Sequence, residues 1–94
     1  MAGRGQSDPP VLPLSDVLTG QEVVLAEITG GRGFRHRLTE MGLTPGIRLE
    51  VVNRGRPGPM IISVKGTRLM LGRGAAHRVL VCPPSAERPR NEEV

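Results

Sequence analysis

The chain has 94 residues and a formal net charge of +4 at pH 7, with 13 basic against 9 acidic side chains. This length allows one domain, its one cysteine excludes an intrachain disulfide, and no segment approaches the about 20 apolar residues that span a bilayer. We therefore expect a cytoplasmic protein without direct membrane insertion, whose basic surface is either simply solvated or meets an anionic partner.

The two ends of the chain differ in composition from its middle. Residues 1–9 show no apolar period, and residues 83–94 are rich in proline and charge. Neither segment has enough apolar side chains to offset the entropy lost on ordering. We predict disordered tails at 1–9 and 83–94 around one folded domain at 10–82.

The folded part begins with a capped turn and a strand. Ser15 and Asp16 are residue types that cap a helix, so we expect a single helical or 3₁₀ turn there. Residues 21–29 predict a first strand, with Val24, Ala26 and Ile28 on one face.

A short helix is predicted over 34–41. Phe34, Leu38 and Met41 are spaced at i, i+4 and i+7, which places them on one inward stripe. Arg35, Arg37 and the other polar residues of this segment fall largely on the remaining faces.

The helix is followed by a sharp corner. Gly42 is suited to the left-handed conformation that ends a helix, and Leu43 is expected to plug the core. Pro45 and Gly46 fit the central positions of a type II turn. A β-branched strand then begins at Ile47.

The remaining elements alternate strands with tight turns. Strands are predicted at 47–54, 60–65, 68–72 and 78–82, a hairpin loop at Gly66-Thr67, and one helical turn at 74–77. This pattern predicts a mainly β fold: a small five-stranded SH3-like barrel, with a short α-helix between strands 1 and 2 and a one-turn helix before the last strand. A five-stranded OB barrel is the nearest alternative.

With these elements placed, the chain resembles the FeoA family, small SH3-like proteins associated with bacterial ferrous-iron uptake. The resemblance runs from about residue 12 to 81 and centres on the run Met-Gly-Leu-Thr-Pro-Gly at 41–46. The same module occurs at the C-terminus of metal regulators of the diphtheria-toxin-repressor type, after a winged helix and a dimerisation helix. The resemblance implies a cytosolic accessory protein of ferrous-iron uptake, whose partner is the FeoB-type GTP-dependent membrane permease.

Enzymatic and metal-binding roles are not favoured by the residues. No catalytic constellation is recognisable, so we predict no enzyme and no cofactor. His36 and Glu40 at i, i+4 could offer a nitrogen and an oxygen to a metal ion, and His77 and Cys82 are the other candidates. Because none of them has zinc-type spacing, a solvated helix face is the preferred interpretation.

Protein–protein docking is the preferred function. Helix, turn and outward strand positions supply the predicted partner-binding residues, which are Arg35, Arg37, Met41, Leu43, Pro45, Ile61 and Met70. Structural roles are predicted for Leu38, Gly42, Pro45, Gly46 and Gly66. Two alternatives stay open: an RNA-binding SH3-like module, which the single aromatic residue disfavours, and a module that binds a divalent transition metal and dimerises. A weak homo-oligomer also stays open.

Overall fold

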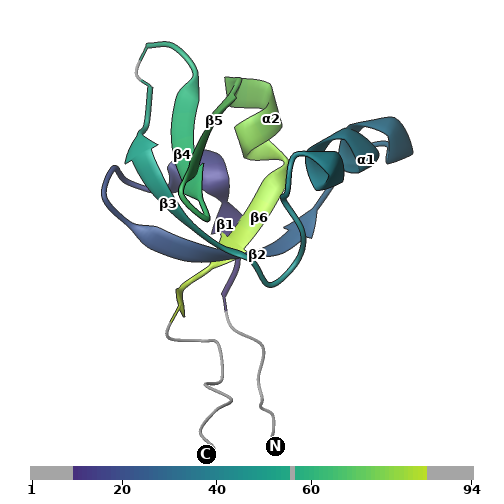
Figure 1. Cartoon of the computed structure of the whole chain (residues 1–94), viewed down its shortest axis with the longest axis horizontal. Helices are drawn as coiled ribbons and strands as arrows, with labels where there is room; N and C mark the ends of the chain where they lie inside the picture. Colours follow the sequence, from purple (N-terminus) through teal and green to yellow (C-terminus); the bar gives the residue numbers. More distant parts are fainter. Residues whose placement is uncertain (1–9, 56, 85–94) are drawn as a thin grey trace, which may run out of the picture.

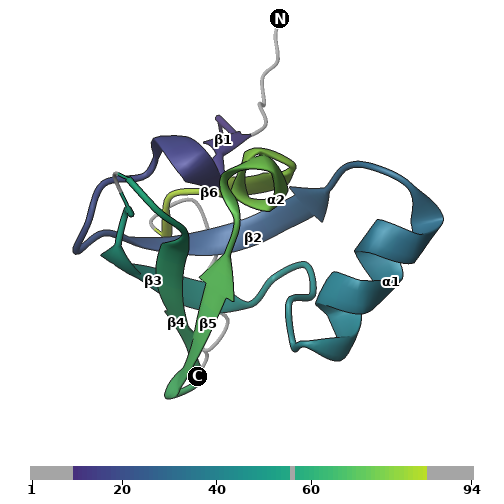
Figure 2. The ribbon, with the colours of Figure 1, turned by 90° about the horizontal axis from the view of Figure 1, so that it is seen from above.

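The computed structural model describes residues 10–55 and 57–84. Its strands form one antiparallel sheet of six strands in the order β1-β6-β2-β3-β4-β5. The elements follow one another as β1 (Leu12–Pro13), η2 (Leu14–Asp16), β2 (Glu22–Ile28), α1 (Arg32–Glu40), β3 (Arg48–Asn53), β4 (Met60–Val64), β5 (Thr67–Leu71), α2 (Arg73–His77) and β6 (Val79–Cys82). The sheet is strongly curved, and α1 stands to one side of it (Figures 1 and 2). The predicted tail at 1–9 and residues 85–94 of the predicted tail at 83–94 lie outside the described residues.

The first two elements differ in part from the prediction. Five strands were predicted, and the additional one is β1, where Leu12 pairs with Val81 and Pro13 with Leu80. Two residues are too few to show an alternation that could be recognised in a sequence. The predicted 3₁₀ turn is confirmed as η2, but its predicted cap is wrong, because Pro13 holds the N-cap position and no side chain caps it.

Strand β2 contains an irregularity that changes which residues face the core. Its register against β6 shifts between Leu25 and Glu27, as in a β-bulge. Leu25 and Ile28 both belong to the core, whereas Ala26 is half-buried. The predicted common face of Val24, Ala26 and Ile28 is therefore wrong, because strict alternation assumes that no residue is inserted.

Helix α1 begins two residues earlier than predicted and ends one residue earlier. Leu38 is buried and Phe34 is half-buried against the core, as expected. Met41 is not part of the inward stripe: 37% of it is exposed. The helix ends at Glu40, and Met41 is its C-cap residue.

The predicted glycine stop after α1 is confirmed. Gly42 has a φ of 101°, its N–H donates to the carbonyl of Thr39 at 3.0 Å, and the N–H of Leu43 donates to the carbonyl of Leu38 at 3.0 Å. These two bonds make a Schellman motif, and the accompanying apolar contact of that motif is supplied by Leu38 and Leu43, both buried.

The predicted type II turn is also confirmed. The N–H of Ile47 donates to the carbonyl of Thr44 at 3.1 Å, and Gly46 has a φ of 93°. The corner is joined to β2, because the N–H of Gly46 donates to the carbonyl of Leu25 at 2.7 Å and the N–H of Leu25 to that of Ile47 at 2.9 Å. The second half of the turn is thus fixed to β2.

Strands β3, β4 and β5 confirm the strands predicted at 47–54, 60–65 and 68–72, and the register of β3 against β4 shifts between Val51 and Asn53. Their inward residues, Leu49, Val51, Met60, Ile62, Val64 and Leu71, are all buried. The predicted hairpin loop is displaced by one residue: Lys65 and Gly66 form it, with φ values of 51° and 82°, and Thr67 already pairs with Val64. Positive φ at both loop residues is the pattern of a type I′ turn.

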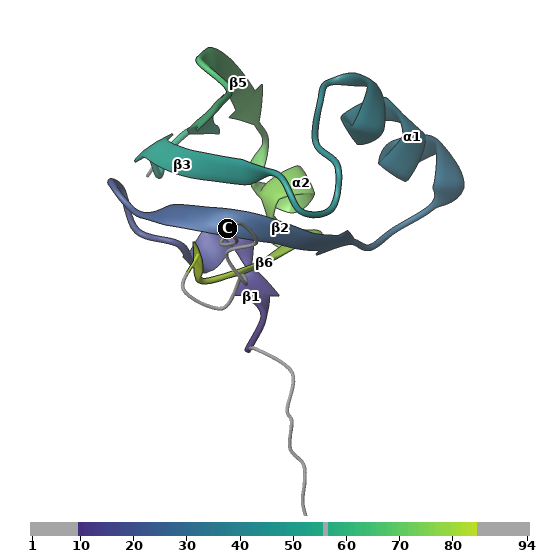
Figure 3. The same ribbon diagram turned by 60° about the horizontal axis from the view of Figure 1, so that its bottom comes forward.

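One core lies inside the curved sheet. It is capped at one end by Leu14 and Val17 from the segment around η2 and by Ala76 from α2. Figure 3 shows β3, β2 and β6 crossing the body of the molecule, with α1 beside them. Over residues 10–55 and 57–84, we find no helix of the length and apolarity that membrane crossing requires.

Candidate partner-binding surface

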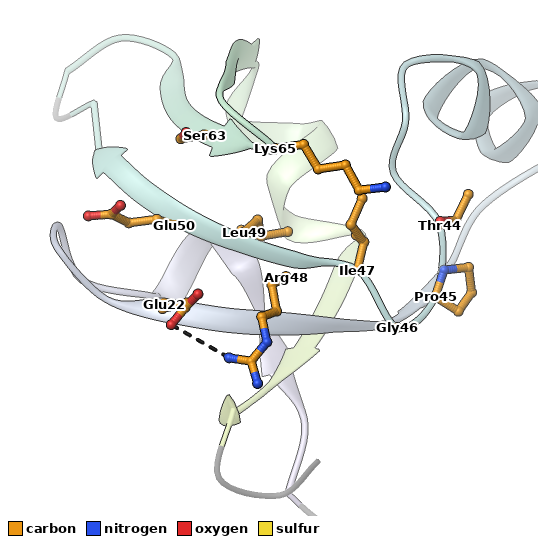
Figure 4. A pocket seen from close by; sticks show the side chains of 10 residues that line it. All are labelled: Glu22, Thr44, Pro45, Gly46, Ile47, Arg48, Leu49, Glu50, Ser63 and Lys65. Atoms are coloured by element: carbon orange, nitrogen blue, oxygen red, sulfur yellow. Dashed lines mark ion pairs between the residues drawn. The ribbon is translucent and has the colours of Figure 1, made fainter. Parts of the chain in front are cut away.

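A shallow groove runs from the corner after α1 across the outer face of the sheet. We call it the corner groove; its volume is about 730 Å³. Its lining residues, all labelled in Figure 4, are Glu22, Thr44, Pro45, Gly46, Ile47, Arg48, Leu49, Glu50, Ser63 and Lys65. The groove therefore combines the predicted turn with outward positions of three neighbouring strands.

The charges of the corner groove follow from strand register. Glu22 of β2 lies opposite Glu50 of β3, and like charges placed directly opposite each other destabilise a sheet. Arg48 offsets this repulsion, since its Nη1 lies 3.7 Å from Oε1 of Glu22 (Figure 4). Both side chains are about half exposed, so the pair contributes at most about 1 kcal/mol. With Lys65, the groove carries two acidic and two basic side chains.

A smaller hollow adjoins the corner groove at the end of α1. We call it the apolar hollow; its volume is about 350 Å³, and its lining includes Met41, Ile47, Val64 and Leu69. It shares Thr44, Ile47 and Lys65 with the groove. In Figure 4 the Lys65 side chain extends toward Ile47, so these two residues lie where the surfaces meet.

Two of the predicted partner-binding residues lie on these surfaces. Met41 lines the apolar hollow and Pro45 lines the corner groove. Leu43 lies between them in sequence, but it is fully buried and offers no surface to a partner. Its predicted role as a core plug agrees with this burial; a role in contacting a partner does not.

The other predicted partner-binding residues lie elsewhere. Arg35 and Arg37 are exposed on α1 and line neither surface. Ile61 and Met70 are opposite each other on β4 and β5, and 65% of Met70 is exposed. The structure thus separates the predicted set into three places instead of one.

Most residues of the corner groove were not predicted from the sequence as a binding surface. Ile47 was predicted only as the start of a strand, and Lys65 only as the last residue of the strand at 60–65. Their common surface depends on the turn at Pro45 and Gly46 folding against β2, a contact that no local spacing reveals. The available signal for this surface was the presence of charged residues at outward strand positions close to that turn.

The four weak metal candidates are not brought together. Nε2 of His36 lies 3.2 Å from Oε2 of Glu40 on the exposed face of α1. Nδ1 of His77 lies 3.5 Å from Oγ of Ser15, and Cys82 is buried in β6. Among the residues that the structure describes, no three His, Cys, Asp or Glu side chains gather into a group that could hold a metal ion.

Comparison with known proteins identifies the family. The sequence pattern of the FeoA domain matches residues 12–83. Over 69 residues the chain is 41% identical to a protein of Methanocaldococcus jannaschii provisionally named Fe(2+) transport protein A, covering 73% of this chain and 83% of the relative. A crystal structure of an iron uptake regulatory protein (FeoA) matches with a TM-score of 0.70 at 43% identity, over 77% of this chain and 95% of that one.

The fold extends to a second class of protein. A manganese-dependent transcriptional repressor matches with a TM-score of 0.76 at 22% identity, over 82% of this chain and 44% of the repressor. This likeness concerns the fold alone, and it confirms with the FeoA structure that the mainly β, SH3-like fold was predicted correctly. The chain belongs to the FeoA family of ferrous-iron transport accessory proteins.

Proposed function

We propose that this protein is a non-enzymatic, cytoplasmic accessory of ferrous-iron uptake that docks on the cytosolic part of a FeoB-type GTP-dependent permease. The family membership and the name of the Methanocaldococcus jannaschii relative support the link to Fe²⁺ transport. The docking surface that we propose consists of the corner groove and the apolar hollow.

The observation that carries this proposal is the combination of an apolar hollow with a groove of balanced charge. Met41 is partly exposed at the hollow, and methionine adapts its shape to different partner surfaces. Two acids and two bases in the groove can set the orientation of a protein partner through complementary charges. Phosphate-rich RNA would meet repulsion from Glu22 and Glu50, so the groove favours a protein over RNA.

Docking alters transport only if the accessory binds one state of the permease more tightly than another. The corner suits such discrimination because its backbone is held by the Schellman motif and by the bonds to Leu25. A rigid surface pays little entropy on binding and rejects a partner state of the wrong shape. We therefore expect binding to depend on the nucleotide held by the permease.

The proposal is tested with the immobilised cytosolic region of the permease, without nucleotide, with GDP and with a non-hydrolysable GTP analogue. Met41→Glu places a charge in the apolar hollow and should weaken binding by about tenfold or more, as expected when an apolar contact is replaced by a desolvated charge. Met70→Glu is the matched control, since Met70 is exposed outside both surfaces.

Both variants should keep the far-ultraviolet circular dichroism of the unmodified chain, because neither residue is buried. If Met41→Glu bound the immobilised permease region with unchanged affinity, the proposed surface would be refuted. Failure of the unmodified chain to bind in every nucleotide state would refute the partner itself.

A further inference from the structure

A second pocket, formed by other residues than the corner groove, is lined mainly by basic side chains. We call it the basic pocket; its volume is about 440 Å³, and its charged or polar side chains are Ser15, Asp16, Arg54, Arg73, His77 and Arg78. It shares no residue with the corner groove or the apolar hollow. Its role is therefore separable from the docking proposed above.

The fold brings these residues together from three distant parts of the chain. Arg54 follows β3, Arg73 and His77 are the first and last residues of α2, and Ser15 belongs to η2. Helix α2 packs beside η2, as Figure 2 shows. Arg78 follows α2 directly and also lines the pocket, with its guanidinium beside Phe34.

Two guanidinium groups of the pocket donate to backbone carbonyls, and the third lies against an aromatic ring outside the pocket lining. Nη2 of Arg54 donates to the carbonyl of Ser15 at 3.5 Å, and Nη2 of Arg73 donates to the carbonyl of Gly55 at 3.4 Å. The guanidinium carbon of Arg78 lies 5.4 Å from the centre of the Phe34 ring, a cation–π arrangement. Because a guanidinium has five N–H donors, each of these contacts leaves most donors available.

The positive charge of the basic pocket has little compensation from the protein. Asp16 is its one acidic residue, and the ion pairs found between described residues are His36–Glu40 and Arg48–Glu22, neither of which involves this pocket. Cationic side chains that line one pocket without a carboxylate in ion-pair contact repel one another. Binding of an anion would remove that repulsion.

We propose that the basic pocket binds the phosphate group of a small phosphorylated ligand. Arg54 and Arg73 line the pocket from different parts of the fold, and a tetrahedral phosphate presents acceptor oxygens in several directions, whereas a carboxylate presents two in one plane. The concave shape and the volume of the pocket fit a mono- or diphosphate group with room for the atoms attached to it. The proposal does not depend on the identity of the permease partner.

The test is calorimetric titration of the full chain with inorganic phosphate, pyrophosphate, GDP and guanosine, at low and at raised salt. Pyrophosphate should bind, and its affinity should fall as salt rises, because the attraction is electrostatic. Equal affinity for pyrophosphate and GDP identifies a free phosphate compound as the ligand. Tighter binding of GDP, without binding of guanosine, identifies a nucleotide.

Two arginine variants locate the site. Arg73→Gln should weaken pyrophosphate binding by about tenfold or more, the effect of one charge-assisted contact. Arg68→Gln removes the same charge from exposed β5, outside every pocket described above, and should leave the affinity unchanged. Amide resonances of residues 15–16, 54–55 and 73–78 should shift on titration in the unmodified chain.

Several outcomes would overturn the proposal. The first is that millimolar pyrophosphate does not bind. The second is that both arginine variants lose the same affinity for pyrophosphate. The third is that the amide resonances that shift belong to residues outside the basic pocket. Binding of an acidic peptide in place of every phosphate compound would also overturn it and would assign the pocket to a protein carboxylate.

Discussion

The glycine that ends α1 allows a test in which the effect of backbone strain on the free energy of unfolding is separated from the effect of side-chain contacts. Gly42 has a φ of 101°, and a Cβ built on it meets no atom within 4 Å. Gly42→Ala therefore creates no steric overlap with the rest of the molecule, and its cost is the strain of an L-residue in the left-handed region. That strain is about 1–2 kcal/mol, and Gly42→Asn should cost less because asparagine tolerates this region.

Glycine-to-alanine substitution nine residues earlier in the chain should change the free energy of unfolding in the opposite direction. Gly33 lies within α1 without a positive φ, and a Cβ there also meets nothing within 4 Å. Gly33→Ala reduces the entropy of the unfolded chain and should stabilise the fold by about 0.4–1 kcal/mol. The two variants thus differ in backbone conformation and not in the group that is added.

The chain has no tryptophan or tyrosine, so unfolding is followed by far-ultraviolet circular dichroism in urea and on heating. For a domain of this size, Gly42→Ala should lower Tm by about 4–16 °C, with an unchanged slope of free energy against urea. The assignment of strain to the helix stop would be refuted if Gly42→Ala were as stable as the unmodified chain or more stable. It would also be refuted if Gly42→Ala and Gly33→Ala both lowered the free energy of unfolding.

The remaining stability predictions concern a buried leucine and a strained loop. Leu43→Ala should lower the free energy of unfolding by about 2–5 kcal/mol because Leu43 is fully buried; in urea unfolding, a loss no larger than that of Met41→Ala would contradict its place in the core. Lys65→Asn should raise stability by up to about 1 kcal/mol, because Lys65 has a φ of 51° in a turn that favours Asn-Gly. A lower urea midpoint for Lys65→Asn would show that the lysine side chain stabilises the fold by a contact that outweighs the strain.

The corner after α1 could be predicted because its residues determine their own conformations. Gly42 and Gly46 tolerate positive φ, and Pro45 fixes φ near the value that the first turn position requires. Each preference acts over one or two residues, so the corner can be recognised without knowledge of the sheet. Strand β4 follows a similarly local rule, since an uninterrupted strand alternates buried with more exposed residues, whereas β3 has a register shift between Val51 and Asn53.

The errors arose where distant contacts decide the structure. The bulge in β2 is set by its pairing with β6, and nothing near Ala26 in sequence announces it. The basic pocket joins Arg54 with Arg73 and Arg78 through the packing of α2 against η2. In sequence these arginines stand at separate positions, so no run of basic residues indicates the pocket.

The position of β5 at the end of the sheet has a consequence for how copies of the protein behave at high concentration. A terminal strand presents peptide N–H and C=O groups that a second strand can bind, and this is how many β-proteins aggregate. Here Arg68 lies in that strand and Lys65 in its loop, both exposed, so two copies that approach through β5 bring like charges together. Ionic strength screens that repulsion, and the protection of this edge against aggregation is therefore strongest in dilute salt.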